Sequence, residues 1–165
     1  RTCARLRSKG FVTSASLSTS WAASARSGLG PQRCGRSAIR NALHGRDARL
    51  VAIVGPCSIH ERDSALDYAR RLARLGAELD DALILVMRTY FEKPRTSLGW
   101  KGMINDPRLD GSCEIGLGLE RAREILLAIG ELGLACGSEL LDPITRHYIG
   151  DLLACAASTR RTIPA

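Results

Sequence analysis

The chain has 165 residues, of which 45% are hydrophobic and 25% are charged, a composition typical of one folded domain and not of a disordered or fibrous protein. No apolar run approaches the roughly 18 residues that a membrane helix needs, so a membrane protein is not expected. The net charge of +7 arises in residues 1–40, which contain eight Lys or Arg and no acidic residue, whereas residues 41–165 hold 16 basic and 17 acidic side chains.

Residues 1–35 form a first segment that is rich in Ser, Thr, Ala, Gly and Arg. Neither the period of a helix nor that of a strand runs through it, so we predict a basic, irregular arm. Three interpretations stay open: a disordered arm, an organelle transit peptide, which shares the Arg-rich and Ser-rich composition, or a stretch read in the wrong frame. The folded domain is predicted to span residues 36–165.

Strands and helices are predicted to alternate from residue 36 onward. A short helix over residues 37–43 precedes an apolar strand at 50–54, and an amphipathic helix follows at 63–79. A second strand at 82–88 leads through a long loop at 92–118 to a helix that Gly133 ends. A third strand at 134–141 precedes a helix through residue 153, which Asp142 caps and Pro143 opens.

The strands at 50–54 and 82–88 are continuously apolar, which indicates burial on both faces. Strands of this kind that alternate with helices form parallel β–α units. The pattern fits an open doubly wound α/β sheet or part of a (β/α)8 TIM barrel. Three units are predicted, whereas a complete barrel takes about 250 residues.

Polar side chains follow the first two strands, at the ends where parallel α/β folds bind ligands. Cys57 lies in the sequence Gly-Pro-Cys-Ser-Ile-His at 55–60, which makes it a candidate metal ligand or nucleophile, although a single Cys there is more often structural. Arg88 lies inside an apolar strand, where an unpaired charge is costly, and Pro94 stiffens the loop that follows. We therefore predict anion binding by four cations, rather than a solvated basic loop. These cations are Arg88, Lys93, Arg95 and Lys101.

Two carboxylates, Glu139 and Asp142, follow the third strand. The pair is suited to assisting a metal or orienting the cations, but Asp142 alone is better explained as a helix cap. The three histidines, His44, His60 and His147, have no metal-ligand spacing among themselves.

Together, these motifs resemble the 3-deoxy-D-arabino-heptulosonate 7-phosphate (DAHP) synthases of the bacterial and fungal feedback-regulated type. The resemblance covers about residues 36–154, and its motifs occur in the family's order and spacing. They are Gly-Pro-Cys-Ser-Ile-His at 55–60, Met-Arg at 87–88, Phe-Glu-Lys-Pro-Arg-Thr at 91–96, Gly-Trp-Lys-Gly at 99–102, Ile-Asn-Asp-Pro at 104–107 and Leu-Asp-Pro-Ile-Thr at 141–145. The resemblance implies a cytoplasmic (β/α)8-barrel enzyme that condenses phosphoenolpyruvate with D-erythrose 4-phosphate, the first step of the shikimate pathway to aromatic amino acids.

The resemblance also implies a role for individual residues. Cys57 matches a thiolate ligand of one divalent metal ion, of the Mn, Fe, Co or Zn type. Arg88 matches the arginine that grips phosphoenolpyruvate, and Lys93 matches the catalytic lysine between the two substrates. Arg95 and Thr96 match the pair that holds the phosphate of erythrose 4-phosphate. In the family mechanism, water attacks C2 of phosphoenolpyruvate, C3 forms the new bond, and phosphate leaves with its carbon–oxygen bond broken.

The match weakens after residue 153. Arg161 falls in register with a family arginine at the phosphoenolpyruvate phosphate and is a further substrate-binding candidate, but Pro164 stands where the family has an acidic residue. The family's later metal ligands have no counterpart in the sequence. We therefore predict an amino-terminal fragment with an exposed sheet edge and little activity of its own.

Partners and alternatives follow from the same features. The resemblance implies a homo-oligomer for the full-length enzyme. The alternative function is a non-enzymatic fragment with a regulatory role, or one that binds anions or nucleic acid through the basic arm. Because residues 1–35 contain only one Phe and one Trp for stacking on bases, a nucleic-acid partner is not expected.

Overall fold

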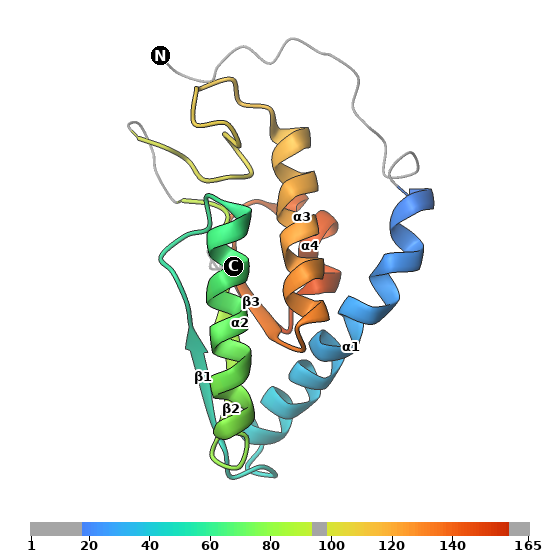
Figure 1. Cartoon of the computed structure of the whole chain (residues 1–165), viewed down its shortest axis with the longest axis vertical. Helices are drawn as coiled ribbons and strands as arrows, with labels where there is room; N and C mark the ends of the chain where they lie inside the picture. Colours follow the sequence, from blue (N-terminus) through green and yellow to red (C-terminus); the bar gives the residue numbers. More distant parts are fainter. Residues whose placement is uncertain (1–17, 94–98, 159–165) are drawn as a thin grey trace, which may run out of the picture.

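Four parallel strands form the centre of the computed structural model, which describes residues 18–93 and 99–158 (Figure 1). The strands lie side by side in chain order: β1 (Leu50–Val54), β2 (Leu83–Arg88), β3 (Ala135–Leu140) and β4 (Cys155–Ser158). Each neighbouring pair is parallel. The carboxyl ends of all four strands therefore lie at the same edge of the sheet.

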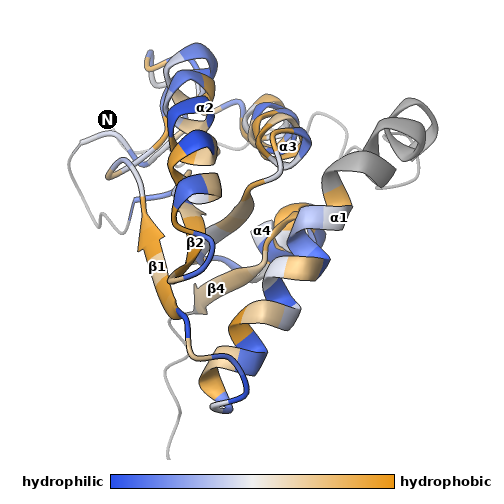
Figure 2. Ribbon diagram, turned by 60° about the horizontal axis from the view of Figure 1, so that its bottom comes forward, coloured by the Kyte–Doolittle hydropathy of each residue, from blue (hydrophilic) through white to orange (hydrophobic). Residues whose placement is uncertain are grey.

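Helices connect the strands and cover one face of the sheet. α2 (Arg62–Glu78) follows β1, α3 (Ile115–Glu131) follows β2, and α4 (Pro143–Ile149) with the 3-10 turn η1 (Gly150–Leu152) links β3 to β4. Figure 2 shows α2 and α3 on the same side of the sheet, and their buried side chains share one core with Met87 of β2 and Cys136 of β3. None of the described helices is long and apolar enough to cross a membrane.

The predicted alternation of strands and helices is confirmed from residue 50 onward. The apolar positions of α2 recur at helical spacing because they face this core. These positions are Ala65, Leu66, Ala69 and Leu72. The long loop ends at residue 114 rather than 118, and the fourth strand, β4, was not among the three predicted units.

A long helix, α1 (Ser18–Leu43), precedes the sheet, so the prediction of an irregular arm is wrong for residues 18–35. Gln32 is fully buried: its Nε2 donates to the Leu134 carbonyl at 3.0 Å, and its Oε1 accepts from the Cys136 N–H at 2.7 Å. Arg36 donates to three carbonyls around η1, those of Gly150, Asp151 and Leu153. These bonds span more than 100 residues of sequence, which explains why local composition did not reveal the helix. Residues 1–17 lie outside the described part of the chain.

The burial of β1 also differs from the prediction. The prediction of burial on both faces is wrong for this strand, because Leu50, Ile53 and Val54 are 71%, 52% and 37% exposed. In the described part of the chain, β1 lies at the edge of the sheet and pairs with β2 alone. By contrast, β2 has strands on both sides and buries Ile84, Val86 and Met87.

Candidate functional site

The predicted site begins where β1 and β2 end. The two strands pair in register from Leu50 with Leu83 to Val54 with Met87, so the chain leaves both strands at the same level. Gly55 then packs against Arg88: a Cβ on Gly55 would lie 2.7 Å from the Arg88 carbonyl oxygen. A residue without a side chain is required for this approach. It places the loop after β1 directly beside the segment after β2.

Cys57 and Lys93, which are 36 residues apart in sequence, are in contact. Lys93 Nζ donates to Cys57 Sγ at 3.0 Å. An Arg88 Nη2 also lies 3.4 Å from the Cys57 carbonyl oxygen. An ammonium group close to a thiol favours the thiolate, which is the form that binds metals and attacks electrophiles. The structure thus brings together three of the residues that the sequence nominated.

Arg88 is held by an aromatic ring. Its guanidinium carbon lies 4.1 Å from the centroid of the Tyr90 ring, a cation–π contact that sequence reasoning did not find. The Arg88 Nε is buried and has no hydrogen-bond partner. Stacking fixes the plane of the guanidinium without using its N–H donors, so Arg88 is suited to bind a carboxylate or phosphate.

Hydrogen bonds fix the segment that carries these cations. The N–H and hydroxyl of buried Thr89 both donate to the Gly137 carbonyl, at 2.7 and 3.1 Å. Ser138 Oγ donates back to the Thr89 carbonyl at 2.6 Å, and the Ile59 N–H donates to the Tyr90 carbonyl at 2.8 Å. The end of β2 is therefore tied to β3 and to the loop after β1.

The far side of the segment is tied to the loop around residue 102. Lys93 N–H donates to the Lys101 carbonyl at 2.9 Å, and Ile104 N–H donates to the Phe91 carbonyl at 3.3 Å. Gly102 has a φ of 104°, and a Cβ there would meet the Phe91 carbonyl oxygen at 2.2 Å. Only glycine combines this backbone conformation with so close an approach.

Glu92 is a buried carboxyl next to Lys93, and sequence reasoning gave it no role. It is 6% exposed, and its Oε1 lies 3.4 Å from the Thr145 hydroxyl of α4. Burial raises the pKa of the Glu92 carboxyl, and nearby Asp142 adds to the rise. In the sequence, Glu92 directly follows the apolar Phe91. This pattern alone does not show that the side chain of Glu92 is buried.

The two carboxylates predicted after the third strand, Glu139 and Asp142, have different surroundings in the structure. Asp142 accepts from the Ile144 N–H at 2.6 Å, so the cap interpretation is confirmed. Glu139 is half-buried at the end of β3. Among the described residues, no three His, Cys, Asp or Glu side chains gather in a way that would hold a metal ion. This part of the chain offers Cys57 as one donor and does not by itself complete a divalent metal site.

Three predicted substrate-binding residues, Arg95, Thr96 and Arg161, lie outside the described residues. Their roles stay predictions. Of the predicted substrate-binding residues, Arg88 and Lys93 lie in the part of the chain that the structure describes.

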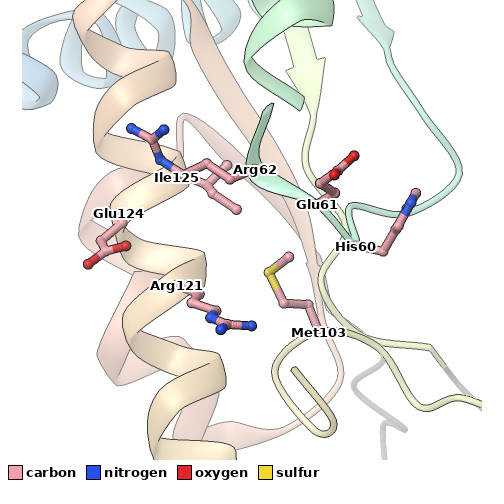
Figure 3. Close-up of a pocket in the computed structure, with 7 residues that line it drawn as sticks. All are labelled: His60, Glu61, Arg62, Met103, Arg121, Glu124 and Ile125. Atoms are coloured by element: carbon pink, nitrogen blue, oxygen red, sulfur yellow. The ribbon is translucent and has the colours of Figure 1, made fainter. Parts of the chain in front are cut away.

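A cavity of about 250 Å³ opens elsewhere, between the start of α2, the loop at residue 103 and α3 (Figure 3). Its lining consists of His60, Glu61, Arg62, Met103, Arg121, Glu124 and Ile125. Arg121 already donates to the Pro107 carbonyl at 2.8 Å, and the two arginines are balanced by two glutamates. The described site residues Cys57, Arg88 and Lys93 do not line the cavity, so it is distinct from the site that they form at the strand ends.

Comparison with known proteins points to one family. The profile of the DAHP synthetase I family matches residues 22–163. A Tyr-sensitive phospho-2-dehydro-3-deoxyheptonate aldolase of Escherichia coli K12 is 51% identical over 127 residues, which cover 77% of this chain and 36% of that protein. A phospho-2-dehydro-3-deoxyheptonate aldolase of Amycolatopsis methanolica is 54% identical over 128 residues, covering 78% of this chain and 63% of that protein.

A solved structure supports the same relationship. The phospho-2-dehydro-3-deoxyheptonate aldolase of Francisella tularensis SCHU S4 superimposes with a TM-score of 0.78 at 42% identity, covering 81% of this chain and 39% of that one. The chain thus spans less than two thirds of the length of each of these relatives.

Proposed function

This chain belongs to the DAHP synthetase I family, and we propose that it carries part of a site that condenses phosphoenolpyruvate with D-erythrose 4-phosphate. The observation that carries this proposal is the convergence of Cys57, Arg88 and Lys93 at the ends of β1 and β2. The same family membership supports the reading of the four parallel strands as part of a (β/α)8 barrel, in which active sites lie at this end of the strands.

Arg88 binds phosphoenolpyruvate in this proposal. Its guanidinium is stacked on Tyr90, and its buried Nε has no hydrogen-bond partner among the described residues. A planar set of N–H donors matches the two oxygens of a carboxylate or phosphate. Arg161 is proposed to hold the phosphoenolpyruvate phosphate, and Arg95 with Thr96 the phosphate of erythrose 4-phosphate. These three assignments rest on the sequence motifs alone.

Lys93 acts between the two substrates in the proposed reaction. The π electrons of phosphoenolpyruvate form the bond from C3 to the aldehyde carbon of erythrose 4-phosphate, and the aldehyde oxygen takes a proton. Water adds its oxygen to C2 and loses a proton. Phosphate then leaves with its carbon–oxygen bond broken and takes the proton of the C2 hydroxyl, which generates the ketone of DAHP. In this proposal, the Lys93 ammonium supplies the proton at the aldehyde oxygen. The hydrogen bond from the Lys93 backbone N–H to the Lys101 carbonyl supports this role, because it fixes the backbone from which the side chain extends.

Cys57 is proposed as one thiolate ligand of a divalent metal ion, which in the family polarises the aldehyde. Because no group of three His, Cys, Asp or Glu side chains among the described residues could hold a metal ion, no step is assigned to a metal here. We expect little turnover from this chain alone for the same reason. Homo-oligomer formation and a cytoplasmic location stay predictions.

The test is binding of phosphoenolpyruvate, measured by isothermal titration calorimetry. The wild-type chain is expected to bind, Arg88→Met to lose at least about tenfold in affinity, and Arg74→Met, which removes an exposed arginine of α2, to bind as the wild type. Equal affinities for wild type and Arg88→Met would contradict the assignment of Arg88. Binding of DNA or RNA that weakens steeply with salt and vanishes without residues 1–35 would support the alternative function instead.

A further inference from the structure

Among the described residues, Glu92 carries a buried carboxyl group that the proposed reaction does not use. Glu92 immediately precedes Lys93, yet the two side chains go to different places. Lys93 reaches the thiol of Cys57, whereas Glu92 packs against α4, where its Oε1 faces the buried hydroxyl of Thr145. Its second oxygen, Oε2, is buried and forms no hydrogen bond.

The buried position of Glu92 is energetically unfavourable, but it allows a contact with α4. A buried carboxyl with one unpaired oxygen is unfavourable, so a residue without a polar head would be tolerated there at lower cost. Among the described residues, the contact with Thr145 is the side-chain hydrogen bond that joins the segment after β2 to α4. The remaining bonds of this segment run to the loop after β1, to β3 and to the loop around residue 102.

We propose that Glu92 is a positioning residue, which anchors the segment after β2 to Thr145 of α4 and thereby holds Lys93 within reach of Cys57. The inference deepens the proposed function and rests on it for the role of Lys93. The raised pKa of the Glu92 carboxyl is consistent with a group shielded from water. The charge of Asp142 raises the pKa of the Glu92 carboxyl further, while hydrogen bonds from the Leu141 backbone, Thr145 and Asn105 lower it.

The contact between Lys93 and Cys57 can be measured without substrate. Thiol alkylation proceeds through the thiolate, which a neighbouring ammonium favours, so the rate at which iodoacetamide modifies Cys57 reports the position of Lys93. Peptide mass spectrometry follows each cysteine separately. Cys136 is fully buried and reports unfolding, and the exposed Cys34 of α1 reports the general reactivity of the reagent.

Four variants decide the proposal. Lys93→Met gives the rate at which iodoacetamide modifies Cys57 when no ammonium group is nearby. We expect this rate to be at least about threefold lower than in the wild type. Glu92→Ala and Thr145→Val are each expected to lower the rate toward that of Lys93→Met. Glu92→Gln keeps an oxygen for the Thr145 hydroxyl and is expected to stay within about a factor of two of wild type.

An unchanged Cys57 rate in Glu92→Ala, with Cys136 still protected, would overturn the proposal. So would a loss in Glu92→Gln as large as in Glu92→Ala, because an anchor made by the oxygen survives that change. If Glu92→Ala exposes Cys136, Thr145→Val provides the same test with less disturbance of the fold. None of these results depends on phosphoenolpyruvate binding, so a failure here is distinguishable from a failure of the proposed function.

Discussion

Gln32 is expected to be among the most important single side chains for stability, although it lies in the part of the sequence that looked irregular. It is fully buried, and it satisfies the Leu134 carbonyl and the Cys136 N–H at 3.0 and 2.7 Å. Gln32→Ala leaves both backbone groups buried without a partner. Each such group costs about 1–3 kcal/mol, so we expect a loss of about 2–6 kcal/mol in the free energy of unfolding. This is a large fraction of the stability of a typical domain.

The assay is urea unfolding followed by far-ultraviolet circular dichroism. Arg33→Ala is the matched control, because Arg33 is the next residue of α1 and is exposed, and it is expected to change stability by less than about 0.5 kcal/mol. Gln32→Leu keeps the volume of the side chain but not its bonds, so it is expected to lose nearly as much as Gln32→Ala. A loss below about 1 kcal/mol in Gln32→Ala would refute the packing of α1 against the start of β3.

Two further predictions concern the site. Because the pKa of Glu92 is raised above its ordinary 4.5 in the fold, the neutral carboxyl stabilises the wild type below that pH, and this contribution is lost as the pH rises through the folded pKa. Glu92→Gln should therefore unfold at a higher temperature than wild type at about pH 7, with the gain shrinking below about pH 4; a gain of the same size at both pH values would contradict this. Gly55→Ala forces a Cβ to within 2.7 Å of the Arg88 carbonyl oxygen, and we expect a loss of about 1–3 kcal/mol and weaker phosphoenolpyruvate binding. Gly76→Ala, whose Cβ would meet only Leu85 at 3.6 Å, is the control, and equal behaviour of the two variants would be evidence against the close approach.

The sequence was sufficient to predict β1, β2 and β3, the helices from residue 50 onward and the position of Cys57 and Lys93 beyond the carboxyl ends of neighbouring strands. Apolar periodicity sets the elements, and parallel strands put their carboxyl ends at one edge of the sheet. The cap at Asp142 was also predictable, because its bond to the Ile144 N–H is local.

Features set by distant contacts could not be predicted in this way. α1 depends on Gln32 and Arg36, whose partners lie more than 100 residues away. The exposure of Ile53 depends on which strand lies at the edge of the sheet, and an apolar run does not carry that information. The inward turn of Glu92 and the stacking of Arg88 on Tyr90 depend on how loops from three strands pack together.

Phosphoenolpyruvate titration of the ¹⁵N-labelled chain, followed by NMR, tests the central claim most directly because it locates the ligand. At 17.8 kDa, the chain is small enough for residue-by-residue assignment. The account predicts that the amide signals of Gly55, Cys57, Arg88 and Lys93 shift together and saturably. Shifts confined to α1, or to Arg121 and the other residues around the cavity of Figure 3, would contradict it.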